Sequence, residues 1–545
     1  MMIVDAPERA TAGTETTRPR ALKGLRSSAA GVLIPLVLLA VAGTLRFSRL
    51  GEPQRCYFDE TYYYYQARDY LARGVEHDFA VHPPLGKWMI AIGLAAFGVD
   101  KGSPLDKAVV VDPGSCSTRE QDENPPARAR EAAESFARRF ASALVGTLWV
   151  GVVYLAGLRL FRRRGTAALA AFLLTVEGLA FTMSRIAMLD VFLGFWVTVG
   201  FWLLLVDRDQ QWASIAGAQD LSEYDPLPRR LRWARLLAGI AFGLALATKW
   251  SGVLAIAAAW LFVLVSELAW RRRLTGTPWV GIGRILTSGI ATLVLVPLVV
   301  YVASYGSWFA HFEDTRPGHQ PCAGQEVAGS RPGGQGCPTS VSGRVQREAR
   351  AWLGEQAEIL RFHHNLEADH PYRASALTWP LMLRPVAYYY EACPATPTDG
   401  GKPCAHPPGQ VAEIVGLGNP FIWWMALPSY LILLWAVIRR REWVAGAIIA
   451  FGGFQYFPWL AGQYIPWVAS RRPVFLFYAT PLVPFLCFAL AYAAMRAGAR
   501  PRLRWVPAAV AVIAVIGFLF WYPVLAGLEI PYAAWRLRMW LPSWV

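Results

Sequence analysis

The sequence lacks the short motifs that mark the commonest nucleotide-binding and hydrolytic sites. It contains no P-loop, no Gly-x-Gly-x-x-Gly after a predicted strand and no Gly-x-Ser-x-Gly elbow. It has no detectable internal repeat, and no Cys-x-x-Cys pair of the kind that binds zinc. These absences exclude the usual NTPases, dehydrogenases and α/β-hydrolases.

Apolar residues, in contrast, are abundant. Hydrophobic residues make up 55% of the 545 positions and aromatic residues 13%, with 24 Trp among them. A soluble protein of this length could not bury so much apolar surface. Lipid must therefore be part of the solvent of this chain.

The excess of basic residues has the distribution expected of a membrane protein. The formal net charge is +15, and Lys and Arg occur in short runs between apolar stretches, as at Arg162–Arg164, Arg271–Arg273 and Arg439–Arg441. Such runs mark cytoplasmic loops. No long basic stripe could follow a nucleic-acid backbone, so nucleic acid is not an expected partner.

Apolar windows long enough to cross a bilayer predict an all-α integral membrane protein with about eleven transmembrane helices. If the basic tail before the first window is cytoplasmic, every later basic run is also cytoplasmic and the C-terminus is external. A signal peptide ending near Ala40–Ala42 is the alternative for the first window, but a signal anchor is favoured. The predicted spans are 30–47, 136–158, 166–184, 187–206, 233–249, 250–268, 283–304, 420–438, 443–461, 473–495 and 505–526.

This topology divides the chain into four parts. Residues 1–29 form a cytoplasmic basic tail, and residues 30–304 form an N-terminal membrane module with a first external loop at 48–135. Residues 305–418 form a second external loop, and residues 419–545 the C-terminal membrane helices. The two external loops carry most of the candidate chemistry.

Six of the seven cysteines fall in these two loops, and only Cys487 lies in a predicted span. An even external set suggests disulfide bonds in an oxidising space, although six cysteines allow 15 pairings. Short separations favour Cys322–Cys337 and Cys393–Cys404, which leaves Cys56–Cys116. Free thiols are the alternative.

Two adjacent carboxylates, Asp59 and Glu60, follow the first span and precede the run Tyr62 to Tyr65. In one interpretation Asp59 is the N-cap of a helix that stops at Gly74, with Glu60 on the helix dipole. In the other, a carboxylate at the membrane face takes the proton from an attacking hydroxyl group. The two are compatible, because a cap fixes the orientation that a base needs.

A second motif, His82-Pro83-Pro84-Leu85-Gly86-Lys87, leads into the apolar stretch 89–98. This stretch is too short to span a bilayer and predicts a re-entrant or interfacial helix. Lys87 could simply snorkel to the head-group level. A lipid phosphate would lie at the same depth, so His82 and Lys87 are candidates to receive one.

With further motifs, these segments make the sequence resemble the protein O-mannosyltransferases, membrane glycosyltransferases of the GT-C class, over nearly the whole chain. The resemblance implies a polyprenyl- or dolichyl-phosphate mannose donor. It implies that no cofactor is required, since the lipid-linked sugar is a substrate; a divalent metal is the open alternative. The motifs are Phe58-Asp59-Glu60, His82 to Lys87, Arg139-Phe140-x-Ser142, Leu189-Asp190, Ala247 to Gly252, His370-Pro371-Tyr372 with Trp379-Pro380, and Gly418-Asn419-Pro420 ahead of Trp423-Trp424.

Ionisable residues at membrane depth are expected to be functional, since each is costly unless it is paired or hydrated. Arg139, Asp190 and Lys249 lie at the external ends of spans, on the same face as Asp59. Ion pairing is the structural alternative for Asp190. Arg139 and Lys249 are expected to line a lipid-phosphate pocket, to which Arg471 and Arg472 before the tenth span contribute.

The second external loop contains three histidines within eight residues, which could suggest a metal site. The resemblance instead assigns the last of them to an outer-loop motif, and Arg and Lys can stabilise a leaving phosphate without a metal. No metal site is therefore expected. The histidines are His363, His364 and His370. The residues expected to position the acceptor or the loops are His370, Tyr372, Asn419 and Trp424.

Three features depart from the family or have no role. Glu177 lies in the third span with no assignable partner. A His-Tyr pair expected in the family appears as Phe477-Tyr478, so a role of that histidine cannot be carried over. The long carbohydrate-binding-like insert of the eukaryotic members is missing, since 305–418 is too short to hold it, which suggests a bacterial form.

The sequence thus predicts a multi-pass enzyme of the plasma membrane, with its active site external. Its expected reaction is inverting transfer of mannose from polyprenyl-phosphate mannose to Ser or Thr hydroxyls of exported proteins. Asp59 is the expected base, and Glu60 would position the acceptor or sugar. The export channel is a possible further partner. The alternatives are transfer to a glycolipid and, from another class, transport, for which related halves would be expected.

Overall fold

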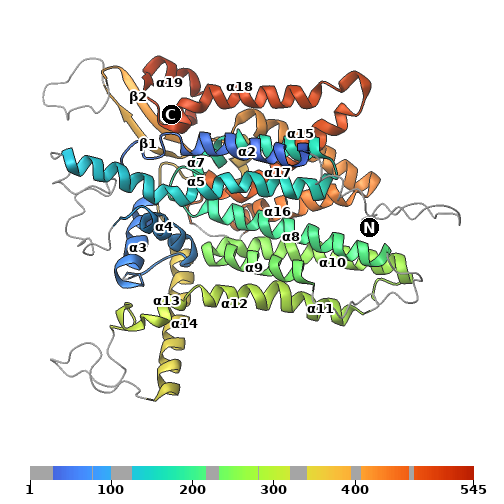
Figure 1. Ribbon diagram of the computed structural model, residues 1–545, viewed down its shortest axis with the longest axis horizontal. Coiled ribbons are helices and arrows are strands. Elements are labelled where there is room, and N and C mark those ends of the chain that lie inside the picture. Colours follow the sequence, from blue (N-terminus) through green and yellow to red (C-terminus); the bar gives the residue numbers. More distant parts are fainter. Residues whose placement is uncertain are drawn as a thin grey trace.

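The computed structural model describes residues 29–76, 78–99, 125–216, 232–279, 281–319, 340–393, 407–465 and 472–545. Within these residues the long helices run side by side as one bundle (Figure 1). The bundle helices are α2 (Ala29–Phe47), α5 (Pro125–Phe161), α6 (Arg164–Thr175), α8 (Asp190–Ala216), α9 (Trp233–Thr248), α10 (Val253–Thr275), α11 (Ile282–Ile290), α12 (Val296–Ala303), α15 (Pro420–Arg440), α16 (Trp443–Tyr464), α17 (Val483–Gly498) and α18 (Val506–Ala526).

Eight helices of the described residues are long and apolar enough to cross a membrane, and they coincide with eight of the predicted spans. The other three predicted spans correspond to shorter apolar helices, Gly31–Phe47, Arg164–Thr175 and Trp233–Thr248. The prediction of a helical multi-pass membrane protein is therefore confirmed. The count of eleven spans stays a prediction.

The third predicted span is interrupted at Glu177. Helix α6 ends at Thr175, and the short helix α7 (Gly178–Met183) begins just after Glu177. The Glu177 carboxylate accepts hydrogen bonds from the backbone N–H groups of Leu179, at 3.2 Å, and Ala180, at 2.6 Å. The start of a helix is a favourable place for a carboxylate, so this membrane-depth charge has the partners that the sequence did not reveal.

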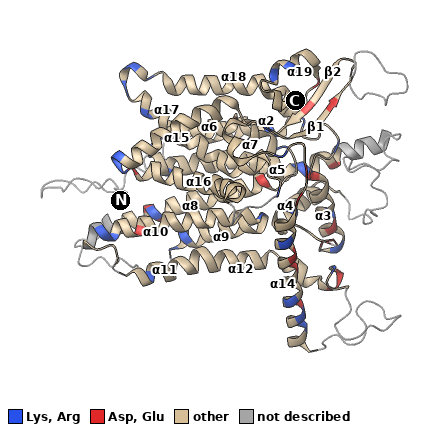
Figure 2. Ribbon diagram, turned by 180° about the vertical axis from the view of Figure 1, so that it is seen from behind, with Lys and Arg blue, Asp and Glu red and all other residues tan. Residues whose placement is uncertain are grey.

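The two ends of the bundle differ in charge. Figure 2 shows Lys and Arg positions in blue where α15 ends, where α17 meets α18 and along α10 and α11, all at one end. Helices α3 (Glu60–Arg73) and α4 (Leu85–Ala96) lie at the opposite end. Which end faces the cytoplasm stays the prediction made from the basic runs.

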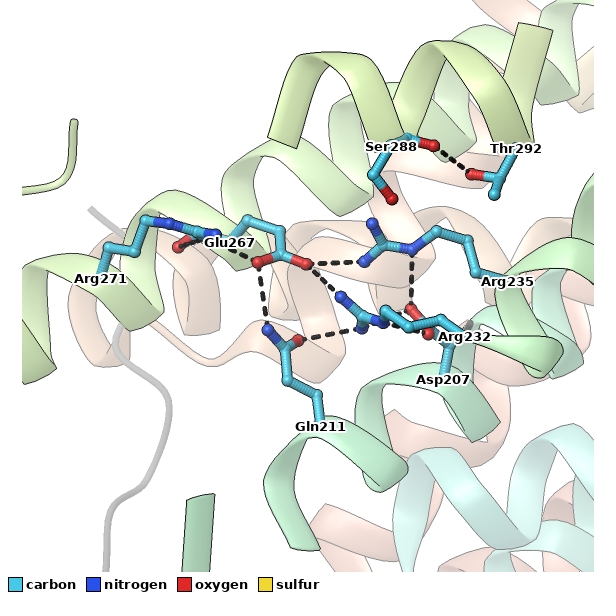
Figure 3. A network of polar contacts seen from close by, with 8 residues as sticks. All are labelled: Asp207, Gln211, Arg232, Arg235, Glu267, Arg271, Ser288 and Thr292. Carbon is cyan, nitrogen blue, oxygen red and sulfur yellow. Dashed lines mark hydrogen bonds and ion pairs between the residues drawn. The ribbon is translucent and has the colours of Figure 1, made fainter. Parts of the chain in front are cut away.

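A buried network of charged groups joins α8, α9 and α10 at the end opposite α3 and α4 (Figure 3). Glu267 accepts from Arg235 at 2.7 Å and from Arg271 at 2.6 Å. Asp207 accepts from Arg232 at 2.7 Å. Every carboxylate here has at least two partners, as buried charges require. The network therefore fixes the three helix ends relative to one another.

The opposite end carries the remaining elements. Helix α4 has 12 residues and is about 18 Å long, too short to cross a bilayer. Helix α14 (Val341–Asn365) runs across the direction of the bundle in Figure 1, with α13 (Gly306–Ala310) beside it. The C-terminal helix α19 (Tyr532–Arg538) lies at this end too.

A small sheet at this end is an addition to the predicted all-α class. Strand β1 (Ala387–Ala392) pairs antiparallel with β2 (Gln410–Val415), which pairs antiparallel with β3 (Ile530–Pro531). Tyr390 lies opposite Glu413 in this register. The sheet thus joins the second external loop to the end of the chain.

The cysteine predictions have mixed outcomes. Cys56 is disulfide-bonded, and its pairing with Cys116 stays a prediction. Cys393 is a buried free thiol, so the predicted Cys393–Cys404 bridge is wrong. Cys393 lies where the β1–β2 hairpin closes, with its N–H bonded to the carbonyl of Gln410 at 2.9 Å, and its thiol is packed in the interior. Cys487, in α17, is free as well. Four cysteines lie outside the described residues, namely Cys116, Cys322, Cys337 and Cys404.

Candidate active site

Asp59 stands on a turn whose shape depends on the residue before it. Phe58 has a left-handed backbone with φ of 52°, which is uncommon for a residue other than glycine. Asp59 occupies the N-cap position of α3, but its side chain makes no capping hydrogen bond. The carboxylate of Glu60 accepts from the N–H of Tyr57 at 3.0 Å instead. The predicted N-cap position of Asp59 is therefore confirmed, but the capping hydrogen bonds expected of its side chain are absent, and its carboxylate is left for other contacts.

Glu60 lies in the protein interior and binds Arg139. The Glu60 carboxylate accepts from Arg139 Nε at 2.9 Å and from the N–H of Ala187 at 2.9 Å. Although burial alone would raise it, Arg139 and Arg138 hold the pKa of Glu60 below its usual range. Arg139 also donates to the carbonyls of Leu50 and Pro53, at 3.1 Å each. This pair therefore anchors the loop that carries Asp59 to α5.

Lys249 and Asp190 form a buried ion pair. Lys249 Nζ lies 2.9 and 3.1 Å from the two carboxylate oxygens of Asp190. It also lies 4.4 Å from the ring centre of Tyr478, a distance typical of a cation–π contact. Lys249 has an extended backbone between α9 and the 3₁₀ turn Trp250–Gly252, which turns its side chain away from the helix axis.

Arg472 is held by His363 and Tyr478. Its guanidinium donates to His363 Nδ1 at 2.5 Å and to the hydroxyl of Tyr478 at 3.1 Å. Since an arginine can only donate, His363 Nδ1 must accept, and its Nε2 carries the proton that bonds to the carbonyl of Val81 at 3.0 Å. Burial and, to a smaller extent, the charge of Arg472 lower the pKa of His363 to about 4. The imidazole is therefore neutral, with both nitrogens in use.

These groups border a cavity of about 280 Å³. Its polar lining residues include His82, Lys249, His363, Arg472 and Tyr478, and its apolar lining residues include Val253, Leu254, Pro458 and Trp459. Asp59 is not one of the lining residues, but the charges of Lys249, Asp190 and Arg472 act on it, so its carboxylate lies within electrostatic range of two lining cations. The pKa of Asp59 is raised to about 6, because burial raises it more than Lys249 and Arg472 lower it, and the Asp190 carboxylate adds to the rise.

His82 and Lys87, which belong to the same motif, have different surroundings. The His82 ring packs against those of His363 and Tyr63, with centres 5.5 and 6.0 Å apart. Burial lowers the pKa of His82 well below its usual range, and Lys249 adds to this, so His82 is neutral. Lys87 is fully buried, pairs with Glu76 and donates to the carbonyl of His82 at 2.7 Å. Lys87 therefore does not snorkel; it holds the loop that presents His82.

The outer-loop motif places its histidine beside the turn of Asp59. The ring of His370 contacts the edges of Phe58 and Phe475, with centres 5.4 and 5.1 Å apart. Its Nδ1 accepts from the N–H of Tyr372 at 3.2 Å, and Arg384 stacks on Tyr372. The motif thus supports Phe58 from outside. Arg471 lies outside the described residues.

Asn419 and the tryptophans that follow form a joint between helices. The Asn419 side chain accepts from the N–H of Phe421 at 3.2 Å, donates to the carbonyl of Val176 at 3.0 Å and to that of Ala514 at 2.8 Å. Trp423 donates to Glu177 at 2.9 Å. The Trp424 ring packs on Trp540, with centres 6.2 Å apart. These contacts lie within the bundle rather than at the cavity.

Replacing Asn419 by Ala should destabilise the protein without a selective effect on either substrate. The change removes the cap of α15 and leaves two buried carbonyls with fewer donors, at a cost of about 2 kcal/mol. Thermal unfolding of the detergent-solubilised protein measures the loss. An unchanged melting temperature, or a rise in KM for one substrate alone, would contradict the structural role.

Several site residues were missed by the sequence reasoning. Tyr63 and Tyr388 are buried, and both interact electrostatically with Asp59 and Asp190. The tyrosine run was visible, and the exposure of Tyr62 beside the buried Tyr63 is ordinary helical periodicity. Tyr478, noted before only as the second residue of the altered Phe477-Tyr478 pair, contacts both Lys249 and Arg472.

No group of three or more His, Cys, Asp or Glu side chains within the described ranges is arranged to hold a metal ion. His363, the residue that suggested one, uses both ring nitrogens in hydrogen bonds to Arg472 and Val81.

Two solved structures are similar to the whole chain. The S. cerevisiae protein O-mannosyltransferase Pmt1–Pmt2 complex bound to the sugar donor gives a TM-score of 0.68 at 15% identity, covering 97% of this chain and 94% of that one. ArnT from Cupriavidus metallidurans bound to undecaprenyl phosphate gives 0.52 at 16% identity, covering 91% and 77%. The predicted GT-C fold is therefore confirmed.

Sequence comparison identifies the family. Residues 36–115 and 118–314 match the family described as dolichyl-phosphate-mannose-protein mannosyltransferase, and residues 349–544 match the C-terminal four-transmembrane region of protein O-mannosyltransferases. The chain is 32% identical over 542 residues to the polyprenol-phosphate-mannose–protein mannosyltransferase of Mycobacterium tuberculosis, which covers 94% of this chain and 92% of that protein. The chain belongs to the dolichyl-phosphate-mannose–protein mannosyltransferase family.

Proposed function

We propose that this protein is a glycosyltransferase that moves mannose from a polyprenyl phosphate to hydroxyl groups of polypeptides. The names of its full-length relatives support the donor and the acceptor class. The observation that carries the mechanism is the environment of Asp59, a carboxylate without a capping bond on which the charges of Lys249 and Arg472 act, two cations that border the cavity.

The reaction is a direct displacement at the anomeric carbon of the mannose. The oxygen of a Ser or Thr hydroxyl attacks this carbon, and the bond from the carbon to the phosphate oxygen breaks. The hydroxyl proton passes to the carboxylate of Asp59, and the polyprenyl phosphate leaves with the electron pair. Displacement from the opposite face inverts the configuration, so a β-linked donor gives an α-linked product.

The polar lining residues of the cavity suit the departing phosphate. Lys249 and Arg472 supply positive charge where negative charge develops, which is the usual way of stabilising such a leaving group. His82 Nδ1 is buried with no hydrogen-bond partner in the described part of the chain, and it offers a further contact. The apolar lining residues, such as Val253 and Trp459, suit the first prenyl units.

The roles of Glu60 and Arg139 follow from their own contacts. Both side chains are fully buried and bind each other and the loop before α3. They act as positioning residues, which keep Asp59 at the cavity. Neither is needed as a direct contact to sugar or phosphate.

The bundle end with α3, α4 and the sheet is the external face in this proposal, with the N-terminus in the cytoplasm and the enzyme in the plasma membrane. Its acceptors are exported polypeptides, which reach this face in an extended state. An enzyme that modifies polypeptides while they are still extended would lie close to the export channel.

A transfer assay tests the proposal. The purified protein in liposomes is given labelled polyprenyl-phosphate mannose and a peptide containing Thr and Pro. We expect labelled peptide as the product. If an α-mannosidase releases the labelled mannose from this peptide and a β-mannosidase does not, the result supports inversion. Label in lipid products alone would indicate a glycolipid acceptor. Movement of donor across the liposome without any transfer would indicate a transporter.

The rate should depend on pH through Asp59. A base must be deprotonated, so kcat/KM for the peptide should fall about tenfold per pH unit below pH 6, the region of the Asp59 pKa, and level off above it. His82 and His363 stay neutral above pH 6, so they add no step there. Initial rates from pH 4.5 to 8.5 measure the profile. A flat profile between pH 5 and 7 would exclude a base with this pKa.

A further inference from the structure

Strand β1 is an edge strand of the small sheet. The strand order is β1–β2–β3, so β1 has a partner on one side only. Within the described residues, β2 is the only element that forms an extended contact with β1. An edge strand presents unpaired N–H and C=O groups, and proteins usually cover or disrupt such edges.

The register identifies the backbone groups that point outward. In an antiparallel pair, successive residues alternate between bonding to the partner strand and facing away from it. Cys393 bonds to β2 through Gln410, so Glu391 and Tyr389 also bond to β2. The N–H and C=O groups of Tyr390 and Ala392 therefore face the open edge, and none of them bonds to another group among the described residues.

The strand leads from this edge to the catalytic carboxylate. The ring of Tyr388 packs against Phe58, with centres 5.9 Å apart, and Tyr389 packs against Tyr57, with centres 5.8 Å apart. Asp59 comes directly after Tyr57 and Phe58 in the sequence, and Tyr388 interacts electrostatically with Asp59. Tyr388 and Tyr390 are two residues apart, or about 7 Å along a strand. An extended chain at the edge would thus reach Asp59 within a few residues.

We propose that the acceptor polypeptide binds by adding a strand to the open edge of β1, with its hydroxyl-bearing residue continuing past Tyr388 to Asp59. This inference rests on the proposed function, because it names how that acceptor is held. Strand addition uses main-chain hydrogen bonds. It therefore accepts many sequences, as an enzyme for many exported proteins requires, and it selects chains that are extended rather than folded.

The pairing predicts a rule for acceptors. Alternate residues of the added strand donate and accept hydrogen bonds, whether the strand runs parallel or antiparallel to β1. Amides at every second position of the acceptor must therefore carry a hydrogen, while the amides between them need not. A proline is tolerated only at the positions between.

An N-methyl scan of the acceptor peptide tests the inference on the unmodified enzyme. Single N-methyl groups are placed along the peptide on one side of its Thr, and then on the other. On one side we expect KM for the peptide to rise roughly fivefold at alternate positions, the loss expected for one hydrogen bond. The positions between should stay near the parent KM, and the donor KM should not change.

A variant of the enzyme gives an independent reading. Ala392→Pro removes an N–H that faces the open edge, and proline is accepted at edges, so the ladder with β2 is kept. We expect a similar rise in the peptide KM with the donor KM unchanged.

If the parent peptide is mannosylated but the methyl scan shows no alternation, strand addition is wrong while the proposed function stands. A change of oligomeric state in Ala392→Pro without a change in peptide KM would assign the edge to a second copy of the chain. If the parent peptide is not mannosylated at all, the proposed function itself fails.

Discussion

Replacing Asp59 by Asn should lower the rate of mannose transfer by about 10²- to 10⁴-fold, the range typical of a lost general base. The amide is isosteric with the carboxylate but cannot take the hydroxyl proton. Glu60, its neighbour, cannot substitute, because Arg139 and Ala187 occupy it. Donor binding should change little. Single-turnover transfer and binding of labelled donor, measured on the same liposomes, separate the two quantities.

Glu358→Gln is a matched control for this variant. It makes the same carboxylate-to-amide change on α14, at a partly exposed residue whose ion pair is with Arg316. Its transfer rate should equal that of the unmodified protein. Robust transfer by Asp59→Asn, or an equal loss in both variants, would reject Asp59 as the base.

Replacing Lys249 by Met should lower kcat/KM for the donor by about 10²-fold or more, because a cation beside the leaving phosphate is lost. The same change leaves the Asp190 carboxylate buried without the partner that it holds at 2.9 Å. An uncompensated buried charge costs about 3–5 kcal/mol, so the protein should also unfold at a lower temperature. Steady-state kinetics and thermal unfolding measure the two effects.

The double variant Asp190→Asn/Lys249→Met distinguishes these effects. It removes both charges of the pair, so most of the lost stability should return. Transfer should stay low, because the cation is still absent. Recovery of transfer together with stability would show that Lys249 serves only to neutralise Asp190, and the phosphate role would be wrong.

The sequence predicted the components of the site better than their connections. Asp59, Asp190 and Lys249 were recognised because charge near the membrane is costly and so demands a reason. The partner of each was harder to predict, because it comes from a distant segment: Glu60 binds Arg139, and His363 binds Arg472. Neither pair can be predicted from the helical or strand periodicity of the sequence around it. Both depend on how α3, α5 and α14 meet at one end of the bundle.

The sheet was missed for a different reason. Ala387 to Tyr390 is a short aromatic run of the kind favoured in strands, but it lies in a loop whose length and polarity dominated its interpretation. The same omission produced the wrong Cys393–Cys404 bridge. Nearness in sequence suggested a bond, whereas the hairpin pairs Cys393 with Gln410.

Glu177 has a consequence for how the family can diverge. Its carboxylate accepts from Leu179 and Ala180 of the N-terminal region, and from the backbone of Asn419 and the indole of Trp423 in the C-terminal region. The two separately recognisable regions of the family thus share one acceptor inside the bundle. Each is therefore a poor candidate for exchange between relatives, since a recombinant must match both donors and acceptor at this junction. The N-terminal and C-terminal regions are therefore expected to be inherited together, although each is recognised separately in the sequence.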